Sequence, residues 1–474
     1  MRPTTIRPRH SRLRGCGPIA AASRNANAPT IAVVHSSSAD AQSSTASLSA
    51  ATAGLEVRPF RALTYRRRDP EQLARVSSPA YDLVTPAGRD RLADADPHNI
   101  VRLILPLVDL AAEDTNRQSA DLAAATLRAW EADGVLVRDD EPSLWVYELS
   151  PADGSEPTVG WLGAVALPPT GSAAVLPHED TYPAAVEGRR ALLAATATDL
   201  EPIVLAHDPD PQVAELTAAA RNSDPTLEVQ DSDGVRHRLW RVTEPEVLDR
   251  LTGALQRTGA VIADGHHRFA AARAHARMTP PPPGTGLILA LVTPMGPGGL
   301  RVAPIHRVVP DLDLDRALTA AATGFRIAEV PVSGGADAVV DAIDRWLASP
   351  EEAGFLVTDG RRLVQLTDPS EEMLAAVPPE APAAWRELDV VLAHHGLLDR
   401  LWHRSDDPDS VLIAHRVNDA VALAVERAGV ALLLRAISPA DVAAVARAGA
   451  RMPRKSTLFV PKPRTGLVLR PLGD

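Results

Sequence analysis

Ala263-Asp264-Gly265-His266-His267-Arg268-Phe269 joins an apolar run to an alanine-rich run near the middle of a chain of 474 residues. The run before this stretch has the length of a buried strand, and the run after it has the composition of a helix. The pattern predicts a strand-to-helix turn with Asp264 as the N-cap, accepting a hydrogen bond from the backbone N–H of His266 or His267. Gly265 would let the backbone pass close to a ligand.

Such a helix start is expected to bind an anion. Its free backbone N–H groups and the positive end of the helix dipole attract negative charge, which His266, His267 and Arg268 would strengthen. The structural alternative is that Asp264 is an ordinary N-cap, that adjacent histidines face different sides of the helix, and that Arg268 reaches solvent. The density of the cluster favours a functional site for phosphate or carboxylate, because active groups gather on loops at strand ends.

The composition describes a globular chain and limits its partners. With 45% hydrophobic and 23% charged residues, the chain is long enough for two or three domains. A net charge of −11 and 3% aromatic residues argue against a general nucleic-acid binder. The single cysteine, Cys16, excludes an intramolecular disulfide framework and fits a reducing, cytoplasmic compartment. No apolar run has the length of a membrane span.

Short strands alternating with helices predict a mixed α/β (α+β) fold in at least two lobes. Residues 1–54 contain no acid before Asp40 and are expected to be a disordered extension, a transit-like leader or the product of a start codon placed too far upstream. We expect a main α/β domain over residues 55–309, a smaller unit over 310–380 and a C-terminal region over 381–474 that packs back on the main domain. An Asp-Gly pair at 359–360 indicates a hairpin.

A second polar cluster, His178-Glu179-Asp180-Thr181, lies between two prolines. A carboxylate beside a histidine on a loop stiffened by proline can be a general base or a metal ligand. The cluster lacks the second histidine of a His-Glu-x-x-His zinc helix, so it is not a zincin motif. An acidic surface loop is the alternative.

Three further candidates come from the first two thirds of the chain. Arg58 lies on a short extended stretch, Asp82 follows Tyr81 in a turn-rich loop, and Arg307 lies on an expected strand. Composition also predicts a strand over residues 100–106.

The C-terminal segment carries a basic, proline-rich loop between expected strands at 456–460 and 467–470. Its Lys455, Ser456 and Lys462 can clamp phosphate oxygens. They can equally belong to a charged hairpin that blunts a sheet edge. No Gly-rich phosphate loop or dinucleotide fingerprint is present in the chain, so a nucleotide would have to bind through a less common phosphate-binding motif.

These motifs together resemble those of the domain of unknown function 1015 family, from about residue 55 to the end. The motifs that carry the resemblance lie at 58–63, 79–82, 178–181, 263–268, 304–307 and 452–462. The chain departs from the pattern at Ser78-Pro79-Ala80-Tyr81-Asp82, where the family more often has paired prolines before the tyrosine, and after Phe269, where alanines replace a frequent Glu-Thr pair. The turn at 264–268 is also similar to the phosphate-binding motif of free-serine kinases, which implies a ParB/sulfiredoxin-like element around Asp264.

We therefore expect a small-molecule phosphotransferase, such as a kinase of free serine, that uses Mg²⁺ with a nucleotide or pyrophosphate. The turn would neutralise the moving phosphoryl group, and Asp264 would orient the turn or hold the metal. Glu179, or failing that Asp82, would take the hydroxyl proton. The remaining candidates divide into phosphate contacts at Gly265, Arg268, Arg307, Lys455 and Ser456, and substrate contacts at His178, Thr181, Asp82 and Arg58.

Two other classes remain open. One is a metal-dependent hydrolase, in which Asp264, His266, His178 and Glu179 converge on one ion that activates water. The other is a non-catalytic nucleotide-binding or ParB-like regulatory module. The sequence does not determine the oligomeric state.

Overall fold

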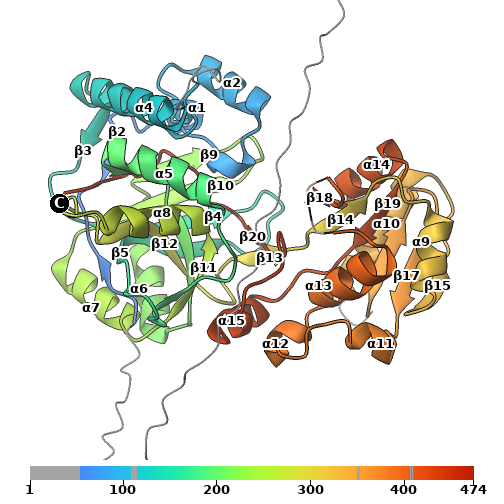
Figure 1. Cartoon of the computed structure of the whole chain (residues 1–474). Coiled ribbons are helices and arrows are strands. Elements are labelled where there is room, and N and C mark those ends of the chain that lie inside the picture. The colour runs from blue at the N-terminus through green and yellow to red at the C-terminus, as the bar shows by residue number, and fades with distance from the viewer. Residues whose placement is uncertain (1–53, 108–114, 350–352, 406, 408, 474) are drawn as a thin grey trace, which may run out of the picture. The chain divides into compact units, whose positions relative to one another are not determined.

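Strand β11 (Ala260–Asp264), which ends in the central motif, lies next to the edge of a nine-stranded sheet (Figure 1). The computed structural model describes residues 54–107, 115–349, 353–405, 407 and 409–473. The expected N-terminal extension lies outside this part, apart from Gly54. The sheet takes its strands in the order β6 (Val175–Leu176), β11, β8 (Ile203–His207), β12 (Leu287–Pro294), β5 (Thr158–Ala166), β4 (Leu144–Ser150), β10 (Arg236–Val242) and β9 (Leu227–Gln230), with β1 (Val57–Arg58) paired to β5.

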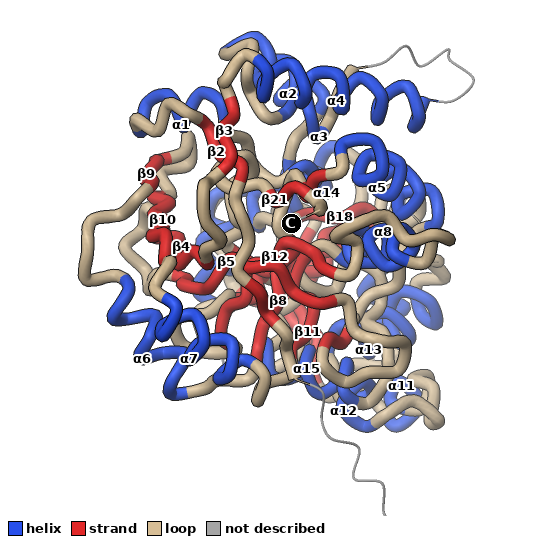
Figure 2. Tube along the Cα trace, turned by 90° about the vertical axis from the view of Figure 1, so that its left-hand side faces the viewer, coloured by secondary structure: helices blue, strands red, loops and turns tan. Residues whose placement is uncertain are grey.

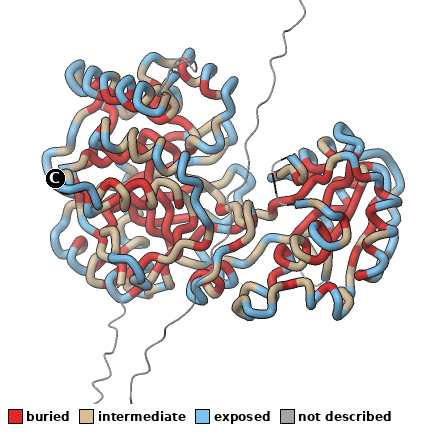
Figure 3. The backbone as a smooth tube through the Cα atoms, viewed as in Figure 1, coloured by how far each residue is buried: buried red, intermediate tan, exposed pale blue. Residues whose placement is uncertain are grey.

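This sheet is mixed and is buried on both faces. Strand β8 is antiparallel to β11 but parallel to β12. Alternate residues of β11 belong to two different apolar clusters: Ala260 and Ile262 to one, Val261 and Ala263 to the other. Because side chains alternate along a strand, this division places a core on each face of the sheet. Figure 3 shows the buried residues gathered in the middle of this region.

Helices surround the strands of this sheet (Figure 2). In chain order they are α1 (Pro70–Val76), the 3₁₀ turn η1 (Tyr81–Leu83), α2 (Pro86–Ala95), α3 (Val101–Ile104), α4 (Thr115–Ala132), α5 (Pro183–Thr196), α6 (Pro211–Ala220), α7 (Pro245–Leu255) and α8 (His266–Ala276). The strand predicted over residues 100–106 is wrong, because this segment forms α3. Asn99 Oδ1 accepts the backbone N–H of Val101 at 2.9 Å, a local bond that starts a helical turn inside an apolar run.

A second sheet of six strands has its own apolar clusters. Its order is β15 (Arg326–Val330), β17 (Leu363–Thr367), β16 (Phe355–Thr358), β19 (Val430–Leu433), β14 (His306–Val309) and β18 (Leu412–Ala414). The hairpin expected at Asp359-Gly360 is confirmed by the antiparallel pair of β16 and β17. The predicted domain boundaries at residues 309 and 380 stay predictions, although this sheet takes strands from either side of both.

Helices of the same region connect these strands, and the two large sheets with separate cores confirm a mixed α/β fold in at least two lobes. The helices are α9 (Leu314–Ala321), α10 (Ala336–Leu347), α11 (Glu371–Leu374), α12 (Ala383–Arg386), α13 (Asp389–Leu392), the π-helix η2 (Ala393–Leu401) and α14 (Val417–Glu426).

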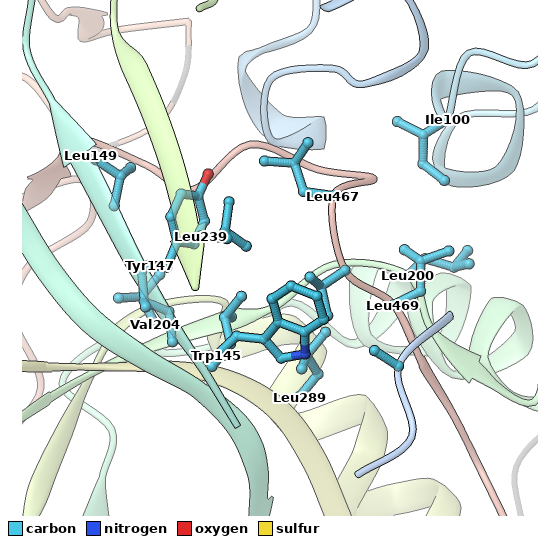
Figure 4. Close-up of a cluster of buried hydrophobic side chains, with 14 of the residues drawn as sticks. Ile100, Trp145, Tyr147, Leu149, Leu200, Val204, Leu239, Leu289, Leu467 and Leu469 are labelled. Carbon is cyan, nitrogen blue, oxygen red and sulfur yellow. The ribbon is translucent and has the colours of Figure 1, made fainter. Parts of the chain in front are cut away.

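The C-terminal segment contributes two strands that pair outside the two large sheets. After α15 (Pro439–Arg447), strand β20 (Leu458–Val460) pairs with β13 (Arg301–Ala303), and β21 (Arg470–Pro471) pairs with β7 (Thr198–Asp199). A third two-stranded sheet pairs β2 (Leu63–Tyr65) with β3 (Leu136–Arg138). The two strands expected around the basic loop therefore do not form a hairpin with each other. Leu467 and Leu469 lie in a buried cluster with Trp145 (Figure 4), and this apolar anchor positions the basic loop.

Candidate functional site

A cavity of about 180 Å³ lies where β11 gives way to α8. Its wall comes from segments far apart in the sequence: residues 81–83, Glu179, the turn at 263–268, Ile305, His415 and the C-terminal stretch around Lys455 to Lys462. A cavity of this size holds a phosphate-sized group with bound water rather than a whole nucleotide, so a larger ligand would extend to its mouth.

The turn itself is built on Gly265. This residue has φ of +95°, and a Cβ atom there would lie 2.7 Å from Cγ2 of Ile203, so neither the backbone angle nor the space suits a side chain. Helix α8 begins at His266 with Gly265, not Asp264, as its N-cap. The predicted capping role of Asp264 is therefore wrong. No side chain of the described chain caps α8, so its first N–H groups stay available to an anion at the cavity.

Asp264 instead takes part in a buried cluster of charges. Its Oδ2 accepts from Arg268 at 2.6 Å, and its Oδ1 lies 2.6 Å from Lys462 Nζ. Lys462 also bonds to Oδ2 of Asp82 at 2.5 Å, and its side chain is only 8% exposed. Two carboxylates thus converge on one ammonium group.

Charge pairing outweighs burial throughout this cluster. Burial acts to raise the pKa of Asp264. The positive charges of Lys462 and Arg268 lower it by more than burial raises it, so the carboxyl pKa lies below its usual value. Burial acts to lower the pKa of Lys462, but Asp264 and Asp82 raise it above the usual value. Lys462 and Asp264 are accordingly charged at neutral pH.

The two histidines of the motif bind a neighbouring loop. His266 Nε2 accepts the backbone N–H of His178 at 3.3 Å, and His267 Nε2 accepts that of Tyr182 at 3.1 Å. A ring nitrogen that accepts a hydrogen bond carries no proton, so both imidazoles are neutral in this arrangement. Burial lowers the pKa of both rings, in agreement with that state. The histidines therefore fix the 178–182 loop to the helix start, whereas the sequence suggested that they neutralise phosphate.

Glu179 is presented to the cavity by that fixed loop. Its side chain is 29% exposed, and its Oε1 accepts from Thr457 Oγ1 at 3.0 Å. Burial raises the pKa of this carboxyl above its usual value. His178, the residue before it, is fully buried behind the cavity wall, and burial lowers its pKa to about 4. His178 thus supports the loop from behind and does not line the cavity.

The basic segment supplies Lys455 to the cavity, whereas Arg307 and Ser456 support the backbone of the turn that carries Lys455. Lys455 lines the cavity and is exposed. Arg307 Nη2 donates to the backbone carbonyls of Arg454 at 3.1 Å and Lys455 at 2.9 Å, so it supports the turn that carries Lys455. Ser456 Oγ donates to the carbonyl of Pro453 at 2.7 Å within the same turn. Neither Arg307 nor Ser456 lines the cavity.

Two predicted substrate contacts lie elsewhere. Arg58 is exposed and pairs with Glu56, and Thr181 is exposed outside the cavity wall. Among the polar cavity residues, Thr457 and His415 were not predicted as site residues. Thr457 lies in the basic segment that was singled out, but nothing in the local pattern marks a threonine or an isolated histidine as facing a distant loop.

Asp264 was predicted to be a metal ligand, but the described residues around it do not form a metal site. In the part of the chain that the structure describes, no group of three or more His, Cys, Asp or Glu side chains is placed to hold a metal ion. The convergence of Asp264, His266, His178 and Glu179 on one ion, which the hydrolase alternative requires, is therefore not present in this arrangement.

No described helix is both long and apolar enough to cross a membrane.

Comparison with known proteins gives a family match and distant structural likenesses. The model of the family described as "Protein of unknown function (DUF1015)" matches residues 57–391, whereas the search of curated proteins finds no match. A mutant free serine kinase in complex with ADP is similar at 12% identity and a TM-score of 0.32, over 66% of this chain and 94% of that one. SbnI with a C-terminal truncation from Staphylococcus aureus is similar at 12% identity and a TM-score of 0.32, over 65% and 85%. A conserved hypothetical protein from Pyrococcus furiosus is similar at 14% identity and a TM-score of 0.28, over 60% and 87%.

Proposed function

The chain belongs to the DUF1015 family, and from the cavity that its motifs line we propose that it is a phosphotransferase acting on the hydroxyl of a small molecule. The acceptor that we propose is a free amino acid such as serine, and the donor is a nucleotide or pyrophosphate. The observation that carries this proposal is the joint presence, in one cavity, of an uncapped helix start, basic side chains and a carboxylate with a raised pKa.

The donor phosphates would bind at the helix start. Backbone N–H groups of α8 meet the cavity there, and Lys455, Lys462 and Arg268 add positive charge around it. Catalysis of phosphoryl transfer arises mostly from positioning and from neutralising the charge on the phosphoryl oxygens, which is what this arrangement can supply.

Asp82 and Asp264 are the residues that would hold Mg²⁺ arriving with the donor. Their oxygens converge on Lys462 Nζ at 2.5 and 2.6 Å, so the ion would have to take the place of this ammonium group. Mg²⁺ is bound in such sites by one or two carboxylates together with the substrate phosphates. The ion would neutralise phosphate charge.

Glu179 is the better candidate for the base that takes the hydroxyl proton. The carboxylate of Asp82 is already bonded directly to the Lys462 ammonium group. Glu179 has a hydroxyl as its hydrogen-bond partner and a raised pKa, which suits it to take up a proton from a hydroxyl. Because only the ionised form can accept the proton, the rate should fall as the pH drops through that raised pKa.

The test is phosphoryl transfer followed by ³¹P NMR, with ATP, ADP and pyrophosphate as donors and a panel of hydroxyl amino acids as acceptors. Glu179→Gln should lower kcat by about 10²–10⁴-fold, the usual contribution of a general base. Asp180→Asn is the matched control, because Asp180 is the next residue and its side chain is 88% exposed. Lys455→Met should raise the KM for the donor and reduce its dependence on salt.

The outcomes separate the alternatives. Absence of transfer with all three donors across the panel would remove the phosphotransferase proposal. Donor binding without transfer would favour the non-catalytic nucleotide-binding module that the sequence left open.

A further inference from the structure

We propose that Thr457 is a positioning residue that orients the carboxylate of Glu179 toward the acceptor hydroxyl, an inference that rests on the proposed function. The two residues are 278 positions apart in the sequence, and Thr457 Oγ1 donates to Glu179 Oε1 at 3.0 Å. No sequence motif includes both.

The Thr457 hydroxyl has a second hydrogen-bond partner, the ring of His178. Thr457 Oγ1 also lies 2.9 Å from Nε2 of His178. A hydroxyl has one proton, so if Thr457 donates it to the carboxylate, it must accept from a protonated Nε2 of His178. His178 is neutral near pH 7, since burial lowers its pKa to about 4, and a neutral ring still carries one N–H.

His178 cannot easily turn away from Thr457. Its side chain is fully buried and packs edge-on against His266 with ring centroids 4.6 Å apart. Its backbone N–H donates to His266 Nε2, and its carbonyl accepts the N–H of Met452 at 2.7 Å. The chain His178–Thr457–Glu179 is thus held at its buried end by both α8 and the C-terminal segment.

This arrangement leaves one oxygen of the Glu179 carboxylate to take the proton of the acceptor hydroxyl. Within the described residues the side-chain hydrogen bond of Glu179 uses Oε1, and Oε2 is available to an acceptor hydroxyl. The charged groups that face Glu179 are Lys455 and Lys462 of the C-terminal segment and Asp264 of β11. The neutral ring of His178 lies 4.0 Å from Glu179 Oε1. Burial raises the pKa of Glu179, whereas the Thr457 hydroxyl and the two lysines lower it.

Thr457→Val removes the hydroxyl and keeps the shape of the side chain, while Thr457→Ser keeps the hydroxyl. A hydrogen bond to a charged group favours the ionised carboxylate enough to expect about a tenfold loss of kcat on the acidic side of the pH profile for Thr457→Val. The acidic limb should move to higher pH, the KM for the donor should stay unchanged, and Thr457→Ser should restore the wild-type profile.

A second measurement does not depend on turnover. The carboxyl of Glu179 is titrated by infrared difference spectroscopy of the full chain, with Glu179→Gln as the reference that identifies its band. A higher titration midpoint in Thr457→Val than in wild type and Thr457→Ser supports the inference. Equal midpoints, or a Thr457→Val pH profile that matches wild type, would overturn it. If wild type transfers no phosphoryl group, the proposed function fails while the titration still decides whether Thr457 controls Glu179.

Discussion

Replacing Lys462 by methionine should destabilise the protein strongly at neutral pH and much less in acid. The ammonium group lies 2.5 Å from Asp82 and 2.6 Å from Asp264, with a side chain only 8% exposed. At an effective dielectric constant of about 20, each contact corresponds to a gross attraction of about 6 kcal/mol, most of which desolvation offsets. Removing one partner of a buried pair costs about 3–5 kcal/mol. Because Asp264 keeps Arg268, we expect a loss of about 3 kcal/mol in the free energy of unfolding.

The sign of the pH dependence follows from the pKa shifts. Lys462 and Arg268 hold the pKa of Asp264 below its usual value despite burial, so this pairing stabilises the fold above the unfolded-state pKa of about 4 and loses that effect as the pH falls. In Lys462→Met the carboxylates lack their ammonium partner and take up protons at higher pH. The difference in stability between variant and wild type should therefore shrink between pH 7 and pH 5.

The assay is urea denaturation at both pH values, followed by tryptophan fluorescence. Arg362→Met is the matched control, since Arg362 also bridges two carboxylates, Asp315 and Glu329, but on the surface with 45% of its side chain exposed. An exposed bridge of this kind should contribute less than about 1 kcal/mol. Equal losses for the two variants, or a loss for Lys462→Met that does not change with pH, would refute the assignment of a buried charge cluster.

Two further changes test other parts of the argument. Gly265→Ala should destabilise by at least about 1–2 kcal/mol, because alanine is strained at φ of +95° and its Cβ would lie 2.7 Å from Ile203. The control is Gly253→Ala inside α7, where an added Cβ would have no neighbouring atom within 4 Å. This control should stabilise by about 0.5–1 kcal/mol in the same denaturation assay. Glu148→Gln should destabilise by about 2 kcal/mol at pH 7, since the fully buried carboxylate bonds to Arg221 and Arg238. Despite burial, these arginines hold the pKa of Glu148 below its usual value, so the loss should shrink once the pH falls below about 4. The control Glu228→Gln, which touches only the exposed bridge to Arg236, should change stability by less than about 0.5 kcal/mol, and a similar loss in both variants would contradict the role of Glu148.

The sequence by itself determined the local elements whose signals are local. The apolar run at β11, the alanine-rich helix after it and the hairpin at Asp359-Gly360 follow from periodicity and turn chemistry, and all are present. The need for glycine at 265 came from the structure, which shows φ of +95° at this residue. Where a local bond competes with composition, the prediction failed: the side chain of Asn99 starts a helix in a run that reads as a strand.

Only the tertiary structure decided which charges meet. Asp264 reads as an N-cap, but Arg268 one turn later and Lys462 from the far end of the chain compete for its oxygens and prevail. His266 and His267 read as cations, but the backbone of the 178–182 loop donates to both rings and keeps them neutral. Asp82 and Lys462 are 380 positions apart, and contacts over such separations depend on strand order and on the apolar anchoring of the C-terminal segment, which periodicity along the chain does not encode.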